Sequence, residues 1–485
     1  MAKIPPQAVI IEELGSDGRP RAVLRCSPET GRLQTSLPPS YSSPRTGTSI
    51  LNKCMSPFLP AGYPSTVTPD YTPYQIYDSL QAFASTIAGL LASRAVFVGM
   101  GVGSEEASVL TTMLLYIAQE TVGRVATILF AHQFSQRIEA EVKFYRFFAD
   151  IVNDVAFVLD CMSPAMPILG RVVTLCLSNA CRAVCGVAGG SSKAILSSHF
   201  AKAGNIGELN AKDGSQETVI SLLGMWVGGV VVSKVHGTLA TWSWLVPLLA
   251  LHLWANWKAV RSVRLNSFNT NRALVFFRAA LEGRTLDMEQ VAQEETVLGW
   301  PAASRGIYGL EPCYFQVGSS VQDLVHRVYA GADQPSQPAS TVGHLVQLFC
   351  DEDYLLWFDI ETGEALVLLK DTATGITQAK GLCHMLRCYV KARTLTQATG
   401  RDVSERVDEC QGTDNAPETA SAYLTTRHRR CFRLLADTLH ENREQWSVIR
   451  EQAERAGWDL GLTNLTKTRD RRVRATGFVE DKKVR

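Results

Sequence analysis

Runs of apolar residues separated by short polar breaks fill the middle of the chain, between about 75 and 278. The two strongest are TVISLLGMWVGGVVVS (218–233) and TLATWSWLVPLLALHLW (238–254), and VSKVHG between them fits a short turn. The weaker runs lie at 85–103, 107–118, 151–159 and 172–190. About 20 mostly apolar residues in a helix span a bilayer, and tryptophans like those of the second run favour its interface. The pattern therefore predicts a multi-helix bundle, either inserted in a membrane or at the centre of a large soluble protein.

The segments before and between these runs are more polar. FSQRIEAEVKFYRFFAD at 134–150 is predicted to be an amphipathic, charged helix that acts as a soluble connector. Residues 8–25 predict a β-hairpin with its turn at Ser16-Asp17-Gly18. Residues 27–50 predict a flexible linker, because Ser, Thr, Pro and Gly dominate them.

Residues from about 286 onward have the pattern of a water-soluble α+β domain. YLLWFDIETGEALVLLK at 354–370 predicts two strands joined by a turn at Glu361-Thr362-Gly363, and helical patterns follow at 376–395 and 422–457. The expected fold class is mainly α, a multi-helix membrane-associated bundle with a smaller C-terminal α+β domain. We expect three parts: an N-terminal hairpin and linker (1–50), a helical membrane domain (51–285) and a soluble C-terminal domain with a basic tail (286–485).

Composition narrows the function classes. The 485 residues carry a formal net charge of +1, so no global field attracts nucleic acid. The 12 cysteines are scattered and form no CxxC pair, which predicts reduced thiols and no metal site. The first residues lack the features of a secretory signal. Because no Ser-His-Asp, Cys-His, HExxH or phosphate-loop arrangement stands out, we expect no enzymatic activity, no catalytic residues and no bound cofactor.

A proline-rich stretch, FLPAGYPSTVTPDYTPYQIYDSLQAF at 58–83, leads into the first apolar run. Each proline fixes its φ at about −65° and biases the preceding residue towards extended conformations. The stretch therefore predicts a stiff, non-helical strap up to Pro73, which suits the first turn of a helix. This strap is either a collar at a membrane surface or a surface loop of a soluble protein.

This stretch and four later ones, in order, resemble the Root UVB Sensitive family, a eukaryotic domain of unknown function. The later stretches are LLASRAVFVGMGVG, FYRFFADIVNDVAFVLD, NAKDGSQETVISLLGMWVG and HLWANWKAVRSVRLNSFNTNRA, and the five cover about 58–278. One departure is Gln119-Glu120-Thr121, where the family tends to carry an acidic-glycine turn. The resemblance implies a membrane-associated eukaryotic protein, linked in plants to seedling development, ultraviolet-B response and pyridoxal-phosphate homeostasis. It supplies no proven catalytic residues.

Polar side chains inside the apolar helices are the candidate functional residues. An ionisable group in a membrane core is costly, so it usually faces protein or a wet cavity and often has a function. We therefore expect a substrate path, or, if the segments are soluble helices, a set of charges that face water. The candidate path residues are Asp78, Gln81, Arg94, Asp154, Asp213 and Gln216.

Two of these positions suggest an internal repeat. Asp78-Ser-Leu-Gln81 is followed by Gly89, and Asp213-Gly-Ser-Gln216 is followed by Gly224 at the same spacing. Many secondary transporters contain such repeats, with polar groups at the repeat interface. The alternative is two independent N-terminal helix caps. Gly224 and Gly228 also form a GxxxG pattern, which predicts close packing between helices.

A basic segment follows the last apolar run. Its candidate contacts to an anionic ligand or to lipid head groups recur at helical spacings, and the alternative is a solvated face. They are Lys258, Arg261, Arg264 and Arg272. If 218–254 crosses the membrane as a hairpin, both its ends share one side, which the positive-inside rule makes cytosol-like. The C-terminal domain is then expected on that side.

Two functions remain open. The first is a membrane protein that binds or moves a small anionic metabolite, with a possible link to pyridoxal-phosphate homeostasis. The second is a non-catalytic, membrane-anchored scaffold whose C-terminal domain recruits a protein partner. Both place the chain in a lipid bilayer of an unknown organelle, with a possible homo-oligomer and no nucleic acid partner.

Overall fold

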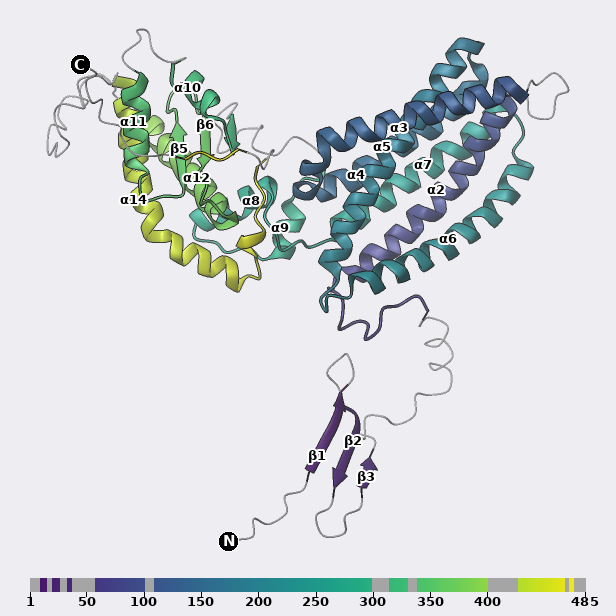
Figure 1. Ribbon diagram of the computed structural model, residues 1–485, viewed down its shortest axis with the longest axis horizontal. Coiled ribbons are helices and arrows are strands. Elements are labelled where there is room, and N and C mark those ends of the chain that lie inside the picture. Colours follow the sequence, from purple (N-terminus) through teal and green to yellow (C-terminus); the bar gives the residue numbers. More distant parts are fainter. Residues whose placement is uncertain are drawn as a thin grey trace, which may run out of the picture. The chain divides into compact units, whose positions relative to one another are not determined.

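The computed structural model describes most of the chain, in nine ranges. They are 9–14, 20–26, 33–36, 57–100, 109–298, 314–329, 338–399, 426–466 and 471–474. The contacts divide the chain into two compact units (Figure 1). The first is Met1–His132 with Tyr145–Val263, and the second is Gln133–Phe144 with Arg264–Arg485. The sequence instead suggested a boundary after residue 285.

The first unit is built from six long helices, which we call the bundle. They are α2 (Tyr71–Gly99), α3 (Val109–Ala140), α4 (Val142–Met162), α5 (Ile168–Phe200), α6 (Ile206–Lys234) and α7 (Thr238–Ser262). Residues 57–70, before α2, are non-helical, and Pro73 lies in the first turn of that helix, as predicted. The mainly α fold class is confirmed, as is a smaller α+β part towards the C-terminus.

Side-chain contacts show that α2, α4 and α6 run in the same direction. Along α2 and α4, Arg146 pairs with Asp78 and Asn153 donates to Ser85. Along α2 and α6, Gln75 near the start of α2 donates to Asp213, and Arg94 near its end donates to the Val232 carbonyl.

The other three helices run in the opposite direction. On α5, Arg182 pairs with Asp160. The last turn of α5 lies against the start of α2, where His199 meets Asp70. On α7, Trp254 lies edge-on to Tyr77, and Leu245 packs nearer the end of α2. Phe130 of α3 stacks on Phe148 of α4, so these helices also reverse. The starts of α2, α4 and α6 therefore gather at one end of the bundle.

Five helices among the described residues are long and apolar enough to cross a membrane: α2, α3 (counted from Thr112), α5, α6 and α7. Helix α4 is not among them, yet it connects α3 to α5 and runs opposite to both. Its 21 residues span about 32 Å at 1.5 Å per residue, close to the thickness of a hydrocarbon core. Helix α4 therefore crosses the same layer as α3 and α5.

The connector prediction for 134–150 is wrong. Helix α3 ends at Ala140, α4 begins at Val142, and the chain reverses between them. Tyr145 and Phe147 are buried because they pack on Phe130 and Trp257 respectively. The aromatic residues of this segment need a packing partner, which a solvated connector does not offer.

The second unit contains a sheet in the order β4-β6-β5, with β6 antiparallel to β5 and parallel to β4. The strands are β4 (Phe315–Val317), β5 (Tyr354–Phe358) and β6 (Ala365–Leu369). The predicted β5–β6 hairpin is confirmed, and Gly363 in its turn has a φ of 66°, which favours glycine.

The second unit also contains the helices α8 (Thr270–Leu281), α9 (Met288–Glu294), α10 (Val321–Tyr329), α11 (Pro338–Leu348), α12 (Gly375–Thr399) and α14 (Thr426–Arg455). Of these, α11, α12 and α14 contact the sheet, whereas α8 packs on α12, α9 on α8 and α10 on α11. The core between them is a single apolar cluster that includes Phe276, Trp357, Tyr389 and Leu435.

The N-terminal hairpin is confirmed, with β1 (Val9–Leu14) antiparallel to β2 (Pro20–Cys26). Its turn at 16–18 lies outside the described residues. The linker prediction for 27–50 is wrong at β3 (Leu33–Ser36), which pairs with β2 and completes a three-stranded sheet. A composition rich in Ser and Thr does not exclude an edge strand, because threonine itself favours strands.

Candidate functional site

Buried charged side chains meet inside the bundle around Arg146 of α4. Its guanidinium donates to the Asp78 carboxylate at 2.7 Å and to Asp150 at 3.0 Å. It also donates to the Tyr74 hydroxyl at 3.2 Å. Gln81, one turn beyond Asp78, donates to the same Asp78 oxygen at 3.2 Å. Arg146 thus links α2 and α4 through charge-assisted hydrogen bonds.

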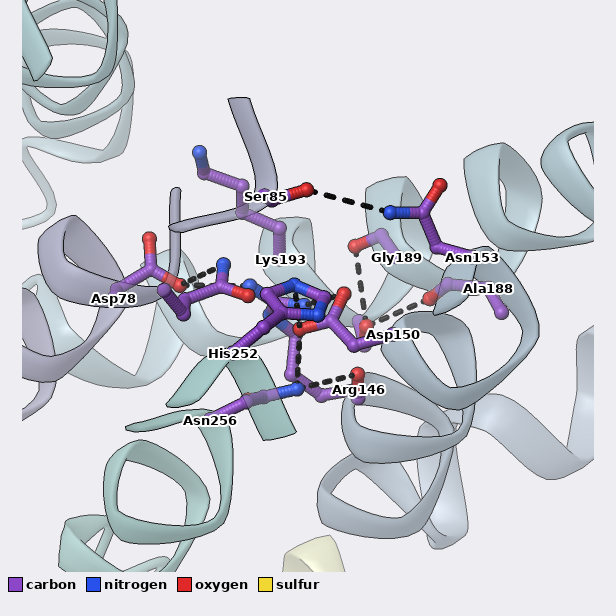
Figure 2. A network of polar contacts seen from close by, with 12 residues as sticks. Asp78, Ser85, Arg146, Asp150, Asn153, Ala188, Gly189, Lys193, His252 and Asn256 are labelled. Carbon is purple, nitrogen blue, oxygen red and sulfur yellow. Dashed lines mark hydrogen bonds and ion pairs between the residues drawn. The ribbon is translucent and has the colours of Figure 1, made fainter. Parts of the chain in front are cut away.

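Helix α7 completes this cluster with His252 and Asn256. His252 Nδ1 lies 2.7 Å from Asp154 Oδ1, and Nε2 lies 3.7 Å from Asp150 Oδ2. Asn256 donates to Asp150. Figure 2 shows His252, Asp150, Arg146 and Asn256 converging from α4 and α7. The imidazole is therefore held between two carboxylates.

A second cluster lies beside the first and joins α2, α5 and α6. Gln75 donates to Asp213 at 2.6 Å and to Gln216 at 2.9 Å. Lys193 pairs with Asp213 at 2.8 Å and with Glu217 at 2.7 Å. Because Gln75 and Asp78 lie one turn apart on α2, the two clusters form one band of polar side chains, here called the polar network.

The strap before α2 contacts this second cluster. Gln216 donates to the Phe58 carbonyl, and Lys212 donates to the Pro57 carbonyl at 2.9 Å. Glu208 accepts from the Ala61 amide at 2.7 Å. The strap thus lies against the first turns of α6, at the end of the bundle where α2 begins.

Most of the predicted path residues meet in the polar network: Asp78, Gln81, Asp154, Asp213 and Gln216. Arg94 does not. It donates to the Val232 and Val235 carbonyls, where α6 ends. The last carbonyls of a helix lack intrahelical partners, so Arg94 acts as a cap for α6. Arg94 therefore lies outside the polar network, and its place in a substrate path stays a prediction.

The sequence prediction missed several members of the network: Gln75, Arg146, Asp150, Lys193, His252 and Asn256. The sequence does contain a signal for part of the network. Arg146, Asp150 and Asp154 recur every four residues and so share a helix face. The connector interpretation of 134–150 placed that face in water. His252 is a single histidine in an apolar run, which has no distinguishing pattern.

Helices α2 and α6 have corresponding geometry. Each has 29 residues, and Asp78 and Asp213 both lie about two turns inside them, so neither is a helix cap. The caps are Asp70 and Asn205. The cap alternative is wrong, and the internal repeat stays a prediction.

The GxxxG packing prediction on α6 is confirmed. A side chain at Gly224 would come within 2.9 Å of Thr86, and one at Gly228 within 2.6 Å of Leu90. Both glycines therefore let α6 approach α2 closely.

The basic segment after α7 is not one helix. Lys258 and Arg261 lie exposed on the last turns of α7, and Arg261 stacks over Trp257. Arg264 follows the helix and pairs with Glu289 at 3.0 Å. Arg272 on α8 is only 3% exposed, with its guanidinium 2.8 Å from Glu295. The predicted surface contact at Arg272 is wrong, because an arginine buried this deeply needs an internal carboxylate.

Glu295 lies between two cations in the second unit. Lys143 Nζ lies 2.6 Å from its other oxygen. Burial alone would raise the pKa of Glu295, but Arg272 and Lys143 hold it below its usual value. Neighbouring Glu141, which accepts from Asn269 at 3.0 Å, behaves differently. Burial raises the pKa of Glu141 to about 7, although Arg272 opposes the shift.

Among the residues that the structure describes, no group of three or more His, Cys, Asp or Glu side chains is placed to hold a metal ion. The carboxylates of the polar network instead pair with Arg146, Lys193 and His252. The chemistry available at this site is hydrogen bonding and charge pairing in a water-poor interior.

The chain is similar in sequence to a protein family and to several known proteins. A family model described as the vitamin B6 photo-protection and homoeostasis domain matches residues 44–284. RUS family member 1 of Dictyostelium discoideum is 38% identical over 223 residues, which are 45% of this chain and 42% of that protein. Protein root UVB sensitive 3 of Arabidopsis thaliana is 32% identical over 279 residues, 57% of this chain and 63% of that protein.

A third relative aligns over more of the chain. Protein root UVB sensitive 6 of Arabidopsis thaliana is 22% identical over 434 residues, 89% of this chain and 80% of that protein. The chain spans less than two thirds of the length of the first two relatives. No solved structure matches the chain.

Proposed function

The chain belongs to the root UVB sensitive family, and from this premise we propose that its bundle is a membrane-embedded unit that binds or moves a small polar metabolite linked to vitamin B6. The sequence suggested an anionic metabolite, and pyridoxal phosphate is the first such ligand to test. The ligand would lie along the polar network between α2, α4, α5, α6 and α7.

One observation carries this proposal: the bundle is polar inside and apolar outside. Asp78, Arg146, Asp154 and Asp213 are all buried. Large apolar side chains cover the outside of the same helices, among them Leu114 on α3, Leu177 on α5 and Leu223 on α6. A charged group in a bilayer is costly and is usually retained for a function, so a band of them across five helices supports a ligand path.

The proposal includes an orientation. Six alternating helices return the chain to the end from which it started, so α2 begins and α7 ends on the same side. Lys258 and Arg261 lie at that end. By the positive-inside rule this side is cytosol-like, and the residues after α7 would enter that compartment.

The test is ligand binding by the full chain purified in detergent. Pyridoxal phosphate, pyridoxine and pyridoxamine would be titrated, because a ligand that binds the folded state raises the melting temperature with ligand excess. Asp213→Asn is expected to remove the response while the protein stays folded. Asp437→Asn on α14, a half-exposed carboxylate paired with Lys391, is the matched control and should respond like the parent.

Two results would refute the proposal: no response to any of these compounds, or release of the chain from membranes by alkaline carbonate. The second result bears on the bilayer itself, since an integral bundle with this apolar surface stays in the membrane pellet.

A membrane-anchored scaffold is the second candidate, and one feature of the second unit favours it. A pocket lies between the start of α10 and the segment 471–474, with Ser320, Asp323 and Arg472 in its lining. A partner protein that binds the parent chain but not Arg472→Glu, in a chain that responds to no vitamin B6 compound, would support the scaffold over the ligand path.

A further inference from the structure

The polar network carries more negative than positive charge. Its buried carboxylates are Asp78, Asp150, Asp154 and Asp213. Arg146 and Lys193 are the cations that pair with them, and His252 is the remaining titratable partner. Four carboxylates therefore face two permanent cations, and even a protonated His252 leaves the network negative. A phosphate ester would add charge of the same sign.

The hydrogen bonds of the network also disfavour an anionic ligand. Three buried side-chain oxygens in the network have no donor: Gln81 Oε1, Asp154 Oδ2 and Asn256 Oδ1. They come from α2, α4 and α7, and all three are acceptors. A buried acceptor without a donor costs free energy, and an anion without hydrogens cannot supply one.

These three oxygens belong to one connected set of contacts. Asp154 reaches Asp150 through His252, and Asn256 donates to Asp150. Gln81 reaches Asp150 through Asp78 and Arg146. The three acceptors therefore belong to one chain of polar contacts, which a hydrogen-bond donor such as an ammonium group can join.

Asp154 is the carboxylate of the network whose negative charge has the fewest neutralising partners. Asp78 and Asp150 share Arg146, and Asp213 has Lys193. Asp154 has only His252, through one of its two oxygens. A positive group beside the other oxygen would make a charge-assisted hydrogen bond, which is stronger than a neutral one.

We infer that the polar network binds a positively charged hydrogen-bond donor, an organic ammonium or protonated pyridine without a phosphate, and that Asp154 is its main contact. This inference rests on the proposed ligand-binding function of the bundle. It narrows the ligand class within vitamin B6 chemistry from the phosphate esters to the unphosphorylated, cationic compounds. Gln81 and Asn256 accept the remaining donors of the ligand.

The experiment compares three probes on the full chain in detergent at about pH 7. Pyridoxamine carries an ammonium group, pyridoxal phosphate carries the phosphate, and inorganic phosphate is the anion alone. Pyridoxamine is expected to raise the melting temperature in proportion to its excess, and the two phosphates are not. Asp154→Asn should weaken pyridoxamine binding at least about tenfold, the effect of losing a charge-assisted contact. Asp437→Asn should leave it unchanged.

A second variant keeps the test decisive if Asp154→Asn does not fold. Gln81→Met removes a donorless oxygen and replaces the side chain with one of similar length. It is expected to weaken pyridoxamine binding in a protein that still folds, because Asp78 loses the Gln81 donor but keeps its ion pair with Arg146. Unchanged binding in both folded variants would overturn the assignment.

The outcomes separate this inference from the proposed function. A response to pyridoxal phosphate but not to pyridoxamine would overturn the inference and leave the function standing. No response to any compound would refute both. Stabilisation by acid alone, without a response to pyridoxamine, would assign the free oxygen of Asp154 to a bound proton and also overturn the inference.

Discussion

Trp226 of α6 and Trp357 of β5 are both tryptophans, but one is exposed and the other is buried. Trp226 is 75% exposed on the bundle, whereas Trp357 is 2% exposed in the sheet of the second unit. In the bundle Asp154 and Arg146 are buried beside a small apolar cluster of Ala88, Ala92, Phe157, Cys161 and Leu245. In the second unit one large apolar cluster fills the interior.

The difference matches the proposal that the bundle lies in lipid and the second unit in water. Burial of apolar area is the dominant favourable term when a protein folds in water, and the second unit follows this rule. In lipid there is no such drive between apolar helices, and small residues and polar contacts join them instead. The bundle uses both, with Gly224 against Thr86 and Arg146 between Asp78 and Asp150.

The largest expected effect comes from truncating an aromatic core residue in the second unit. Phe276→Ala should cost about 3–5 kcal/mol, because Phe276 is fully buried among Phe268, Phe277 and Trp458. Hydrogen exchange of the α8 and β5 amides measures the loss. Phe97→Ala on α2, where the ring is 54% exposed, should change stability by less than about 0.5 kcal/mol. Equal losses at the two positions would remove the contrast between the units.

A positive charge on the outer surface tests the solvent of each unit. Leu222→Arg on α6 should oppose membrane insertion by about 2.5–3.5 kcal/mol, since arginine is costly at the centre of a membrane helix. Val448→Arg on α14 is the matched change at a similarly exposed position and should be neutral within about 0.5 kcal/mol. Fractionation of membranes after expression measures both. A bundle that tolerates Leu222→Arg as well as Val448→Arg would be facing water.

Close packing of α6 on α2 gives a smaller effect. Gly224→Leu should cost about 1–3 kcal/mol, because even its Cβ would lie 2.9 Å from Thr86. Gly229→Leu faces open space and should cost much less. Thermal unfolding in detergent compares the two. Should they unfold at the same temperature, the packing of these helices does not depend on Gly224.

The last expected effect is a pH dependence at Glu141. Burial raises the pKa of this carboxyl to about 7 in the folded chain, above its ordinary value of 4.5, so the folded state holds a proton that the unfolded state releases. Stability should therefore fall as pH rises from about 4.5 to 7 and stay level above that range. Glu141→Gln should remove this slope from the melting temperature. A slope of opposite sign in the parent would mean that Arg272 outweighs burial.

Local patterns were sufficient for many elements. The β5–β6 hairpin followed from two apolar runs around Glu361-Thr362-Gly363, since a turn with positive φ needs a residue such as glycine. The long helices followed from apolar runs, because each satisfies its own backbone hydrogen bonds. Asp78, Gln81, Asp154, Asp213 and Gln216 stood out because a polar residue in such a run is unusual.

Other features depend on contacts that no local pattern contains. The segment 134–150 has both apolar and charged residues at helical spacing, so its pattern fits a solvated helix and a buried polar helix equally. Only the residues packed against the segment decide between the two. Here α2 places Asp78 on Arg146, and α7 places His252 between Asp150 and Asp154. The acceptors of Arg94 and Arg272 could not be predicted for the same reason, because they lie far away in the sequence, at Val232 and Glu295.

The sequence by itself determined that the apolar runs form long helices, where the hairpins lie, and the family to which the chain belongs, because these depend on residues near one another in the chain. Only the tertiary structure decided which charges are partners, that α4 is the polar helix of the bundle, and that three buried oxygens lack donors. Pairing and burial depend on which helix faces come together. The free energy of a buried charge is set by those distant neighbours.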